Sequence, residues 1–302
     1  MIDVPAELAA HHAKCAHESG PEWTAALPGL VGDFVTRWDL RVDGAAMHGV
    51  VSLVVPVLRA DGTPAVLKLS PGTDENLTEG PGLRAWDGDG IVRLLAEETL
   101  PAAGPSGLGN VLLLERLTGP TLETHPDVMT ATELLGGLLA RLTAHPAPAG
   151  LRHLRDIAGA MLEQVPWAME RISPADRPWL DLVAGPVREL VAEPGDRLLH
   201  WDLHFDNVLA AEREPWLAID PKPLAGDPGF DLLPALGNRW DGVADSVKRF
   251  DLLVEMLGLD RARAVGWTLG RVLQNTLWDI EDGESELNQD EFALAEALYR
   301  RG

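Results

Sequence analysis

The sequence predicts a two-lobed α+β protein in which a strand-rich first third is followed by a mostly helical remainder. Residues 36–69 contain alternating and β-branched apolar segments separated by small-residue turns, a pattern typical of antiparallel strands. After residue 128, leucines recur at helical spacing instead. Because Gly119-Pro120 separates the two patterns, we expect residues 1–117 to form an N-terminal lobe and residues 118–302 a C-terminal lobe.

The N-terminal lobe is predicted to be an antiparallel sheet with one inserted helix. Pro21 and Pro28 should prevent any long helix in residues 5–30, because proline lacks the backbone donor that a helix needs. The inserted helix is expected over residues 78–86, and Asp61-Gly62 marks a hairpin turn. The strands are expected over residues 36–42, 50–58, 65–69, 91–99 and 111–117.

The C-terminal lobe is predicted to be a set of amphipathic helices interrupted by a hairpin. Leu135, Leu138 and Leu142 lie on one face of the first helix, which indicates a buried stripe. The hairpin is expected within residues 198–220. The helices are expected over residues 128–145, 153–171, 178–193, 243–258, 260–280 and 289–301.

The composition favours a globular protein with an acidic surface. The chain has 302 residues, 46% of them apolar, and a formal net charge of −22. This charge disfavours nucleic acid and anionic membranes and favours a small cationic ligand, although acidity can also serve solubility alone. Cys15 is the only cysteine, which excludes an internal disulfide and is typical of a reducing compartment. Since a signal pattern and an apolar run of about 18 residues are both absent, we expect a cytoplasmic monomer or homodimer.

The stretch from Leu198 to Asp220 carries the clearest chemical signal. Its core is His200-x-Asp202-x-x-x-x-Asn207, the spacing of the protein-kinase catalytic loop, in which the Asp acts as base and the Asn binds Mg²⁺. Asp220 follows a short hairpin, where such enzymes carry their other metal ligand. We therefore predict phosphoryl transfer, with Asp202 as the catalytic residue and Asn207 and Asp220 as Mg²⁺ ligands.

A nucleotide site is predicted in the N-terminal lobe. Lys68 lies in Ala65-Val66-Leu67-Lys68-Leu69, which is similar to the V-A-I-K strand whose lysine contacts ATP phosphates. Its expected partner is Glu79, with Glu75 as the runner-up. Lysine is scarce in this chain relative to arginine, which makes Lys68 and Lys222 noticeable. Three further nucleotide contacts are expected. Ser52 could offer its hydroxyl to the phosphates, and Glu115 and Leu117 could offer backbone groups where the last strand enters the linker.

Other interpretations of residues 200–207 remain open. His200, Asp202 and His204 could form a hydrolase zinc cluster, but zinc would leave Lys68 and Asn207 without a role. A purely structural turn would not explain the motif spacing. A nucleotide- or antibiotic-binding protein without turnover would need no base, whereas a housekeeping sugar or amino-alcohol kinase would differ only in its acceptor pocket.

On these motifs the chain resembles the aminoglycoside phosphotransferases, which are small-molecule relatives of the protein kinases. Residues 200–207 (HWDLHFDN) are similar to the catalytic loop of that family, and residues 219–223 (IDPKP) to its metal-binding segment. Residues 226–232 (GDPGFDL) resemble the segment that follows. Residues 83–90 (LRAWDGDG) and 278–283 (WDIEDG) are similar to stretches of the streptomycin 6-phosphotransferase and hydroxyurea-resistance branch.

The resemblance implies a protein-kinase-like fold and an ATP-dependent transferase that uses Mg²⁺. Its acceptor would be a hydroxyl of a small cationic molecule, such as streptomycin, and its role antibiotic resistance. Aromatic rings beside acids can hold such a cation through cation–π contacts and charge-assisted hydrogen bonds. We therefore expect the acceptor site in the C-terminal lobe, although Asp231 could brace the catalytic loop instead. The expected acceptor-site residues are His204, Asp231, Trp240, Asp241, Trp278 and Glu281.

Overall fold

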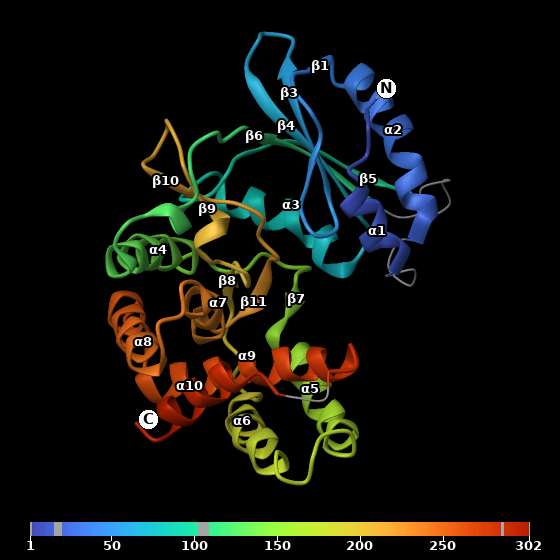
Figure 1. The fold of residues 1–302 in the computed structure, drawn as a ribbon. Coiled ribbons are helices and arrows are strands. Elements are labelled where there is room, and N and C mark those ends of the chain that lie inside the picture. The colour runs from blue at the N-terminus through green and yellow to red at the C-terminus, as the bar shows by residue number, and fades with distance from the viewer. Residues whose placement is uncertain (1, 15–19, 102–108, 285–286, 302) are drawn as a thin grey trace. The chain divides into compact units, whose positions relative to one another are not determined.

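The structure is a computed structural model that describes residues 2–14, 20–101, 109–284 and 287–301. The chain divides into an N-terminal unit, Met1–Thr118, and a C-terminal unit, Gly119–Gly302. The N-terminal unit contains the large sheet, and the C-terminal unit is mostly helical (Figure 1). The predicted fold class, an antiparallel N-lobe sheet with a helical C-lobe, is confirmed.

The N-terminal unit is built on an antiparallel sheet. Its strands are β1 (Leu40–Val42), β2 (Met47–His48), β3 (Leu53–Arg59), β4 (Pro64–Pro71), β5 (Leu94–Leu100) and β6 (Gly109–Glu115). They are ordered β1-β3-β4-β6-β5, and β2 pairs with β3. Side chains alternate along a strand, so Leu67 and Leu69 join the apolar core while Lys68 points to the opposite face of β4.

Helix α2 (Gly20–Arg37), which packs against α1 (Ala6–Lys14), corrects two predictions. A long helix does occupy residues 20–37, and the strand expected from residue 36 begins only at Leu40. Pro21 lies in the first turn, where no donor is needed, and Pro28 costs about 3 kcal/mol. Each buried large apolar side chain contributes about 1.5–3 kcal/mol, so packing outweighs that penalty. The buried side chains, at helical spacing, are Trp23, Leu27, Val31 and Phe34.

Helix α3 (Asp74–Trp86) lies against β5 and β6. It begins before the predicted residue 78 because Thr73 caps it: the Thr73 side chain accepts a hydrogen bond from the backbone N–H of Asn76 at 3.3 Å. The longer helix places Glu79 in its second turn rather than at its start.

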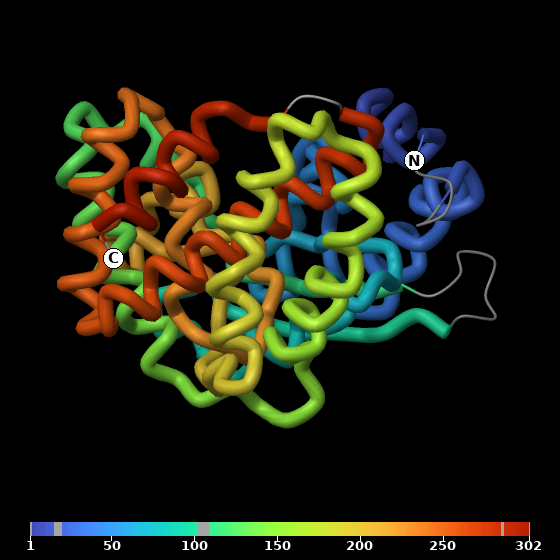
Figure 2. Tube along the Cα trace, turned by 90° about the horizontal axis from the view of Figure 1, so that it is seen from below, coloured from blue at the N-terminus to red at the C-terminus, as the bar shows by residue number. Residues whose placement is uncertain are grey.

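The C-terminal unit is organised around α9, which is buried along most of its length. Its helices are α4 (Val128–Leu142), α5 (Leu154–Met169), α6 (Arg177–Leu190), α7 (Leu232–Gly237), α8 (Val243–Leu257), α9 (Arg261–Glu281) and α10 (Gln289–Tyr299). All the predicted helices of this unit are confirmed, and the short α7 is an addition. Figure 2 shows α5, α6 and α9 side by side. No helix in the described part of the chain has the length and apolar character that crossing a membrane requires.

Short strands and turns complete the C-terminal unit. The strands are β7 (Arg152–His153), β8 (Arg197–Leu199), β9 (Val208–Ala210), β10 (Trp216–Ala218) and β11 (Leu224–Gly226). The single-turn helices are η1 (Leu122–Thr124), η2 (Phe205–Asn207) and η3 (Pro228–Asp231). β11 pairs in parallel with β7 and antiparallel with β8, and β9 forms a hairpin with β10. The loop after β8 therefore runs beside the segment that joins β10 to β11.

Candidate active site

Asp202 lies in a loop whose backbone is held by a buried carboxylate. The backbone N–H groups of His200 and Trp201 donate to Asp231 Oδ2 and Oδ1 at 2.8 and 2.7 Å. Asp231 is completely buried, and burial raises its pKa to about 7, although the two N–H donors and Arg271 act in the opposite direction. Both carboxylate oxygens of Asp231 thus accept hydrogen bonds from the backbone of the loop.

Trp201 turns the chain sharply just before Asp202. Its φ of 67° lies in the left-handed region, which costs a non-glycine residue about 1–3 kcal/mol. The buried indole donates from Nε1 to Gln274 at 3.1 Å, and the guanidinium groups of Arg152 and Arg271 lie 4.3 and 5.3 Å from the ring centre. These contacts stabilise the strained backbone conformation of Trp201. Asp202, the next residue, is half-buried.

His200 joins the catalytic loop to the segment that carries Asp220. Its Nε2 lies 3.0 Å from the carbonyl oxygen of Ile219, so Nε2 carries the proton, and its Nδ1 accepts the N–H of Asp202 at 3.4 Å. Burial lowers the pKa of His200 to about 4, more than the nearby carboxylates Asp202 and Asp220 raise it. A neutral imidazole of fixed tautomer therefore links the two segments.

The β9–β10 hairpin brings Asn207 and Asp220 together. Asn207 precedes β9 and Asp220 follows β10, and the backbone N–H of Ile219 donates to the carbonyl of Asn207 at 2.9 Å. The Asn207 side chain donates from Nδ2 to the carbonyl of Asp202 at 2.9 Å. This bond engages the amide nitrogen and leaves the amide oxygen as the atom that can bind a metal.

The chemistry of this pair fits Mg²⁺. Mg²⁺ prefers carboxylate and carbonyl oxygens, and it takes few protein ligands because water and substrate phosphates complete its shell. The described residues contain no group of three or more His, Cys, Asp or Glu side chains that could hold a metal. Both ring nitrogens of His200 are also engaged in hydrogen bonds inside the protein. The zinc interpretation of residues 200–204 is therefore contradicted.

Lys222 is the partner of the predicted base. Its Nζ donates to Asp202 Oδ2 at 3.0 Å, and its backbone N–H donates to the carbonyl of His200 at 3.0 Å. The two side chains are 38% and 24% exposed, so the pair faces solvent rather than the core. The scarcity of lysine singles out Lys222 in the sequence but does not identify its partner.

The N-terminal unit contains a buried ion pair between Lys68 and Glu79. Lys68 Nζ lies 2.7 Å from both carboxylate oxygens of Glu79, and the two side chains are 8% and 2% exposed. Glu79 reaches β4 from α3, as the sequence analysis expects of it rather than of Glu75. Removing either partner would leave an uncompensated buried charge, so the pair holds Lys68 in one orientation.

Two of the other residues predicted to contact the nucleotide make side-chain hydrogen bonds within the protein. The Ser52 hydroxyl is buried and lies 2.7 Å from that of Ser70. The Glu115 carboxylate accepts the backbone N–H of Arg93 at 3.1 Å, and Leu117 follows the end of β6 half-buried. The side chains of Ser52 and Glu115 are thus engaged within the protein.

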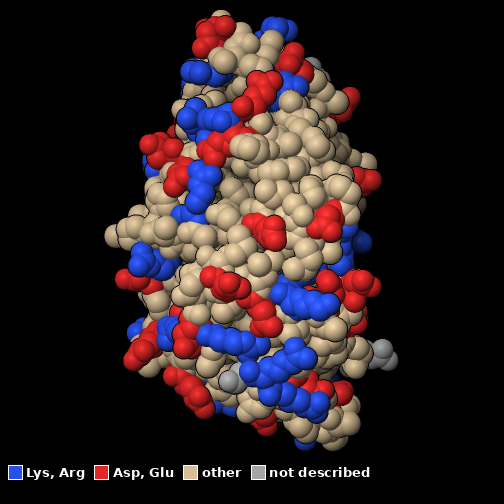
Figure 3. Space-filling view, turned by 90° about the vertical axis from the view of Figure 1, so that its left-hand side faces the viewer, with Lys and Arg blue, Asp and Glu red and all other residues tan. Residues whose placement is uncertain are grey.

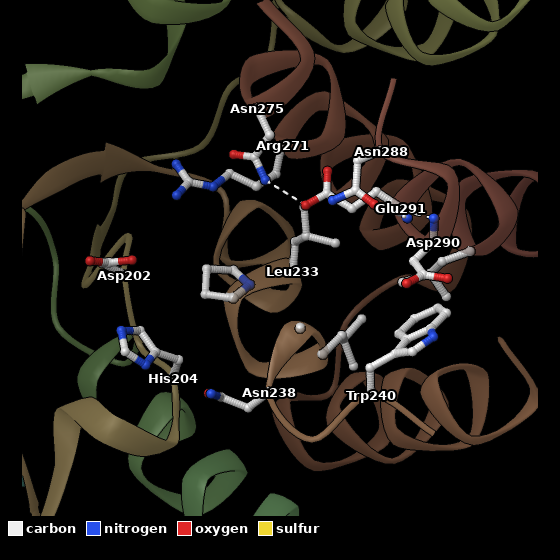
Figure 4. Close-up of a pocket in the computed structure, with 14 residues that line it drawn as sticks. Asp202, His204, Leu233, Asn238, Trp240, Arg271, Asn275, Asn288, Asp290 and Glu291 are labelled. Atoms are coloured by element: carbon white, nitrogen blue, oxygen red, sulfur yellow. Dashed lines mark hydrogen bonds between the residues drawn. The ribbon is translucent and has the colours of Figure 1, made fainter. Parts of the chain in front are cut away.

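A cavity of about 360 Å³ opens beside Asp202 within the C-terminal unit (Figure 4). Asp202 and His204 lie on one side of it, and Trp240, Asp290 and Glu291 lie across from them. Further lining comes from α7, α9 and the turn before α10, including Asn238, Arg271, Asn275 and Asn288. Among the described lining residues three carboxylates face one guanidinium group, so the cavity is acidic.

Comparison with known proteins identifies the family. Residues 37–283 match the family described as aminoglycoside/hydroxyurea antibiotic resistance kinases. The chain is also 55% identical to a streptomycin 6-kinase of Streptomyces glaucescens, over 99% of this chain and 97% of that protein. The chain belongs to the aminoglycoside/hydroxyurea antibiotic resistance kinase family. The predicted enzyme class, a kinase with an alcohol group as acceptor, is confirmed, and a binding protein without turnover is excluded.

A second relative and a solved structure are also similar to this kinase. It is 52% identical to a hydroxyurea phosphotransferase of Kitasatospora aureofaciens, over 100% of this chain and 87% of that protein. A crystal structure of the aminoglycoside phosphotransferase APH(4)-Ia superposes with a TM-score of 0.63 at 14% identity, covering 91% of this chain and 99% of that one. At that identity the likeness concerns the fold, and it agrees with the predicted kinase-like class.

Only some of the predicted acceptor residues line the cavity. His204 and Trp240 line it, whereas Asp231 is buried beneath the loop and Asp241 is exposed. Trp278 is 42% exposed, and its ring lies against Trp201 and Arg271.

Glu281 also lies outside the cavity, at the exposed end of α9. It follows Asn275, the last α9 residue at the cavity, by about 9 Å along the helix axis. The residues that form the far wall, above all Asp290 and Glu291, were not among the predicted acceptor residues. Their only signal was their position in the first turn of the last predicted helix.

Proposed function

We propose that this kinase transfers the γ-phosphoryl group of ATP to a hydroxyl of a cationic aminoglycoside, with streptomycin as the first candidate. The position of Asp202 carries the proposal, because its carboxylate forms one wall of the acidic cavity. Asp202 Oδ2 is bonded to Lys222, whereas Oδ1 has no hydrogen-bond partner among the described residues. Oδ1 can therefore accept the proton of a substrate hydroxyl.

The far wall of the cavity supports a cationic acceptor. Asp290 and Glu291 present carboxylates and Trp240 an aromatic ring, which together suit guanidino or amino groups. Asn275 Nδ2 donates to Glu291 Oε1 at 2.9 Å, which fixes the direction of that carboxylate (Figure 4). The similarity to streptomycin 6-kinases points to the same chemical class of acceptor.

The predicted nucleotide and metal residues keep their roles in this proposal. In this proposal Lys68, held by Glu79, binds phosphate oxygens of ATP, and Asn207 and Asp220 bind Mg²⁺. When bound, Mg²⁺ neutralises negative charge on the phosphates. Backbone groups near Ser52, Glu115 and Leu117 complete the nucleotide contacts.

Hydroxyurea is the second candidate acceptor, because one relative with 52% identity is named a hydroxyurea phosphotransferase. Hydroxyurea is small and uncharged, so the carboxylates across from Asp202 would have no role in binding it. A sugar or amino-alcohol kinase would share the same motifs. The acceptor therefore distinguishes the three alternatives.

The test is a transfer assay with purified kinase, ATP and Mg²⁺, in which the phosphorylated product is identified by mass spectrometry. Streptomycin, hydroxyurea and an uncharged sugar serve as acceptors, and EDTA removes the metal. Asp202→Asn should lower kcat for streptomycin by roughly 10²–10⁴, because an amide cannot accept the hydroxyl proton, while KM for ATP stays close to the wild-type value.

Asp196→Asn is the matched control, because the Asp196 side chain is 92% exposed in the same unit. It should retain full activity. The assignment of Asp202 is refuted if the D202N enzyme turns over within a few-fold of wild type. Faster phosphorylation of hydroxyurea or the sugar than of streptomycin would refute the proposal that streptomycin is the acceptor.

A further inference from the structure

Lys222 is held rigidly beside the predicted base. Pro221 and Pro223 flank it and restrict the backbone of the segment, and its own N–H is bonded to the carbonyl of the buried His200 at 3.0 Å. Its ammonium group donates to Asp202 Oδ2 at 3.0 Å. Lys222 is therefore held at both its backbone and its side chain, whereas a lysine in an ordinary surface ion pair is held only by its side chain.

The ion pair gives the two oxygens of Asp202 different tasks. Oδ2 accepts from Lys222, and Oδ1 is without a hydrogen-bond partner among the described residues. An ammonium group has three N–H donors, of which Asp202 takes one. With 38% of the Lys222 side chain exposed, the other donors remain accessible to a ligand.

We infer that Lys222 is a second catalytic residue, whose ammonium group binds an oxygen of the transferring γ-phosphoryl group while it directs Asp202 Oδ1 to the acceptor hydroxyl. This inference rests on the proposed function, in which Asp202 accepts the hydroxyl proton.

The transfer step itself places the phosphoryl group near Lys222. The acceptor oxygen forms a bond to the γ-phosphorus, the bond from that phosphorus to the bridging oxygen of ADP breaks, and its electron pair leaves with ADP. The hydroxyl proton passes to Asp202 Oδ1. Before transfer the hydroxyl lies about 2.6–3.2 Å from Asp202, and the reacting oxygen and phosphorus are about 3–3.5 Å apart. Lys222, bonded to the same carboxylate, is then within reach of the non-bridging phosphoryl oxygens.

The expected magnitude separates this role from a merely structural one. Negative charge spreads over the three non-bridging oxygens in the transition state, where a fixed cation stabilises it. Loss of one such donor lowers kcat by roughly 10²–10³. A half-exposed ion pair with no catalytic role contributes little to stability, and its loss would change turnover only a few-fold.

The experiment compares Lys222→Met with Lys248→Met. Lys248 is an exposed lysine on α8 of the same unit and does not line the cavity, so the control removes the same charge outside the proposed site. K222M should lower kcat by roughly 10²–10³ with KM for ATP and streptomycin within a few-fold of wild type, and K248M should match wild type. Lys222→Arg, which keeps the charge and the donors, should restore part of the loss. Lys222→Gln replaces K222M if the Met variant does not fold.

A sulfur substitution distinguishes a phosphoryl contact from mere orientation of Asp202. In ATPγS a sulfur replaces one non-bridging γ-oxygen and weakens any hydrogen bond made there. The ratio of the rates with ATP and ATPγS should therefore be smaller in K222M than in wild type. An unchanged ratio would overturn the inference, as would K222M turnover within a few-fold of wild type.

Slow hydrolysis of ATP without an acceptor provides the second readout. Because the phosphoryl contact does not depend on the acceptor, K222M should lower this rate as well, and K248M should not. This measurement tests Lys222 even if streptomycin proves to be the wrong acceptor. Loss of activity in D202N together with normal hydrolysis and transfer in K222M would leave the proposed function intact and reject the role of Lys222.

Discussion

At the scale of single residues, His200 shows how one buried side chain joins the two segments that carry Asp202 and Asp220. It bonds through Nε2 to the segment before Asp220 and through Nδ1 and its backbone carbonyl to the residues around Asp202 and Lys222. A charged imidazole would turn Nδ1 into a donor facing the N–H of Asp202, and its charge would lie in a buried site. The fold therefore requires the neutral form.

The neutral state of His200 predicts a pH dependence of stability. The pKa is about 4 in the folded protein and about 6.5 in the unfolded chain, so below pH 6.5 the unfolded chain takes up a proton that the folded protein refuses. Stability is fully present above pH 6.5 and falls by about 3 kcal/mol as the pH drops to about 4. Urea unfolding of wild type and His200→Gln at several pH values measures this difference. Parallel stability curves for the two proteins would contradict it.

Asp220 carries the prediction for the metal. Asp220→Ala removes a hard oxygen ligand, so the Mg²⁺ concentration that gives half-maximal activity should rise by roughly tenfold or more. Excess Mg²⁺ should restore part of the turnover. Asp196→Ala, which removes a carboxylate whose side chain is 92% exposed in the same unit, is the control. Superimposable Mg²⁺ titrations of D220A and wild type would show that Asp220 is not a ligand.

At the scale of elements, α9 and α10 decide which groups face Asp202. Arg271 and Asn275 are four residues apart on α9 and therefore share the face that lines the cavity. Asn288 caps α10 by accepting the backbone N–H groups of Asp290 and Glu291 at 3.2 and 3.3 Å. This cap fixes the first turn of α10, and with it the acidic wall.

The acidic wall predicts selectivity for charged acceptors. Glu291→Gln removes the charge but keeps an oxygen that can accept from Asn275. KM for streptomycin should rise by roughly tenfold or more, because a hydrogen bond between charged groups is lost, while KM for ATP stays constant. The assay is best run at about pH 8, since burial raises the pKa of Glu291. Glu281→Gln, at the exposed end of α9, should change neither constant; equal effects of the two substitutions would move the acceptor site.

At the scale of the whole molecule, the net charge of −22 does not by itself mark a site. On the face shown in Figure 3, acidic and basic side chains are interspersed. The acidity to which we assign a role is instead local, in the carboxylates that line one cavity in the C-terminal unit. The predicted site residues fall in both units: the Lys68–Glu79 pair lies in the N-terminal unit, and Asp202, Asn207 and Asp220 lie in the C-terminal unit.

The sequence by itself determined the fold class, the family and the positions of the catalytic-loop motif. These features depend on local spacing: a strand alternates every second residue, and a short hairpin brings Asn207 and Asp220 to adjacent positions whatever surrounds it. The Lys68–Glu79 contact was predictable for the same reason, because a strand and the next helix along the chain form it.

Only the tertiary structure decided the acceptor wall, the partner of Lys222 and the course of α2. The cavity combines residues from around 202, 233–240, 271–275 and 288–294, and no local pattern specifies how such distant segments pack. Helix α2 continues through Pro28 because burial of its apolar face outweighs a local penalty. Local rules thus predict what neighbours in the chain do, whereas packing between distant segments determines which side chains meet.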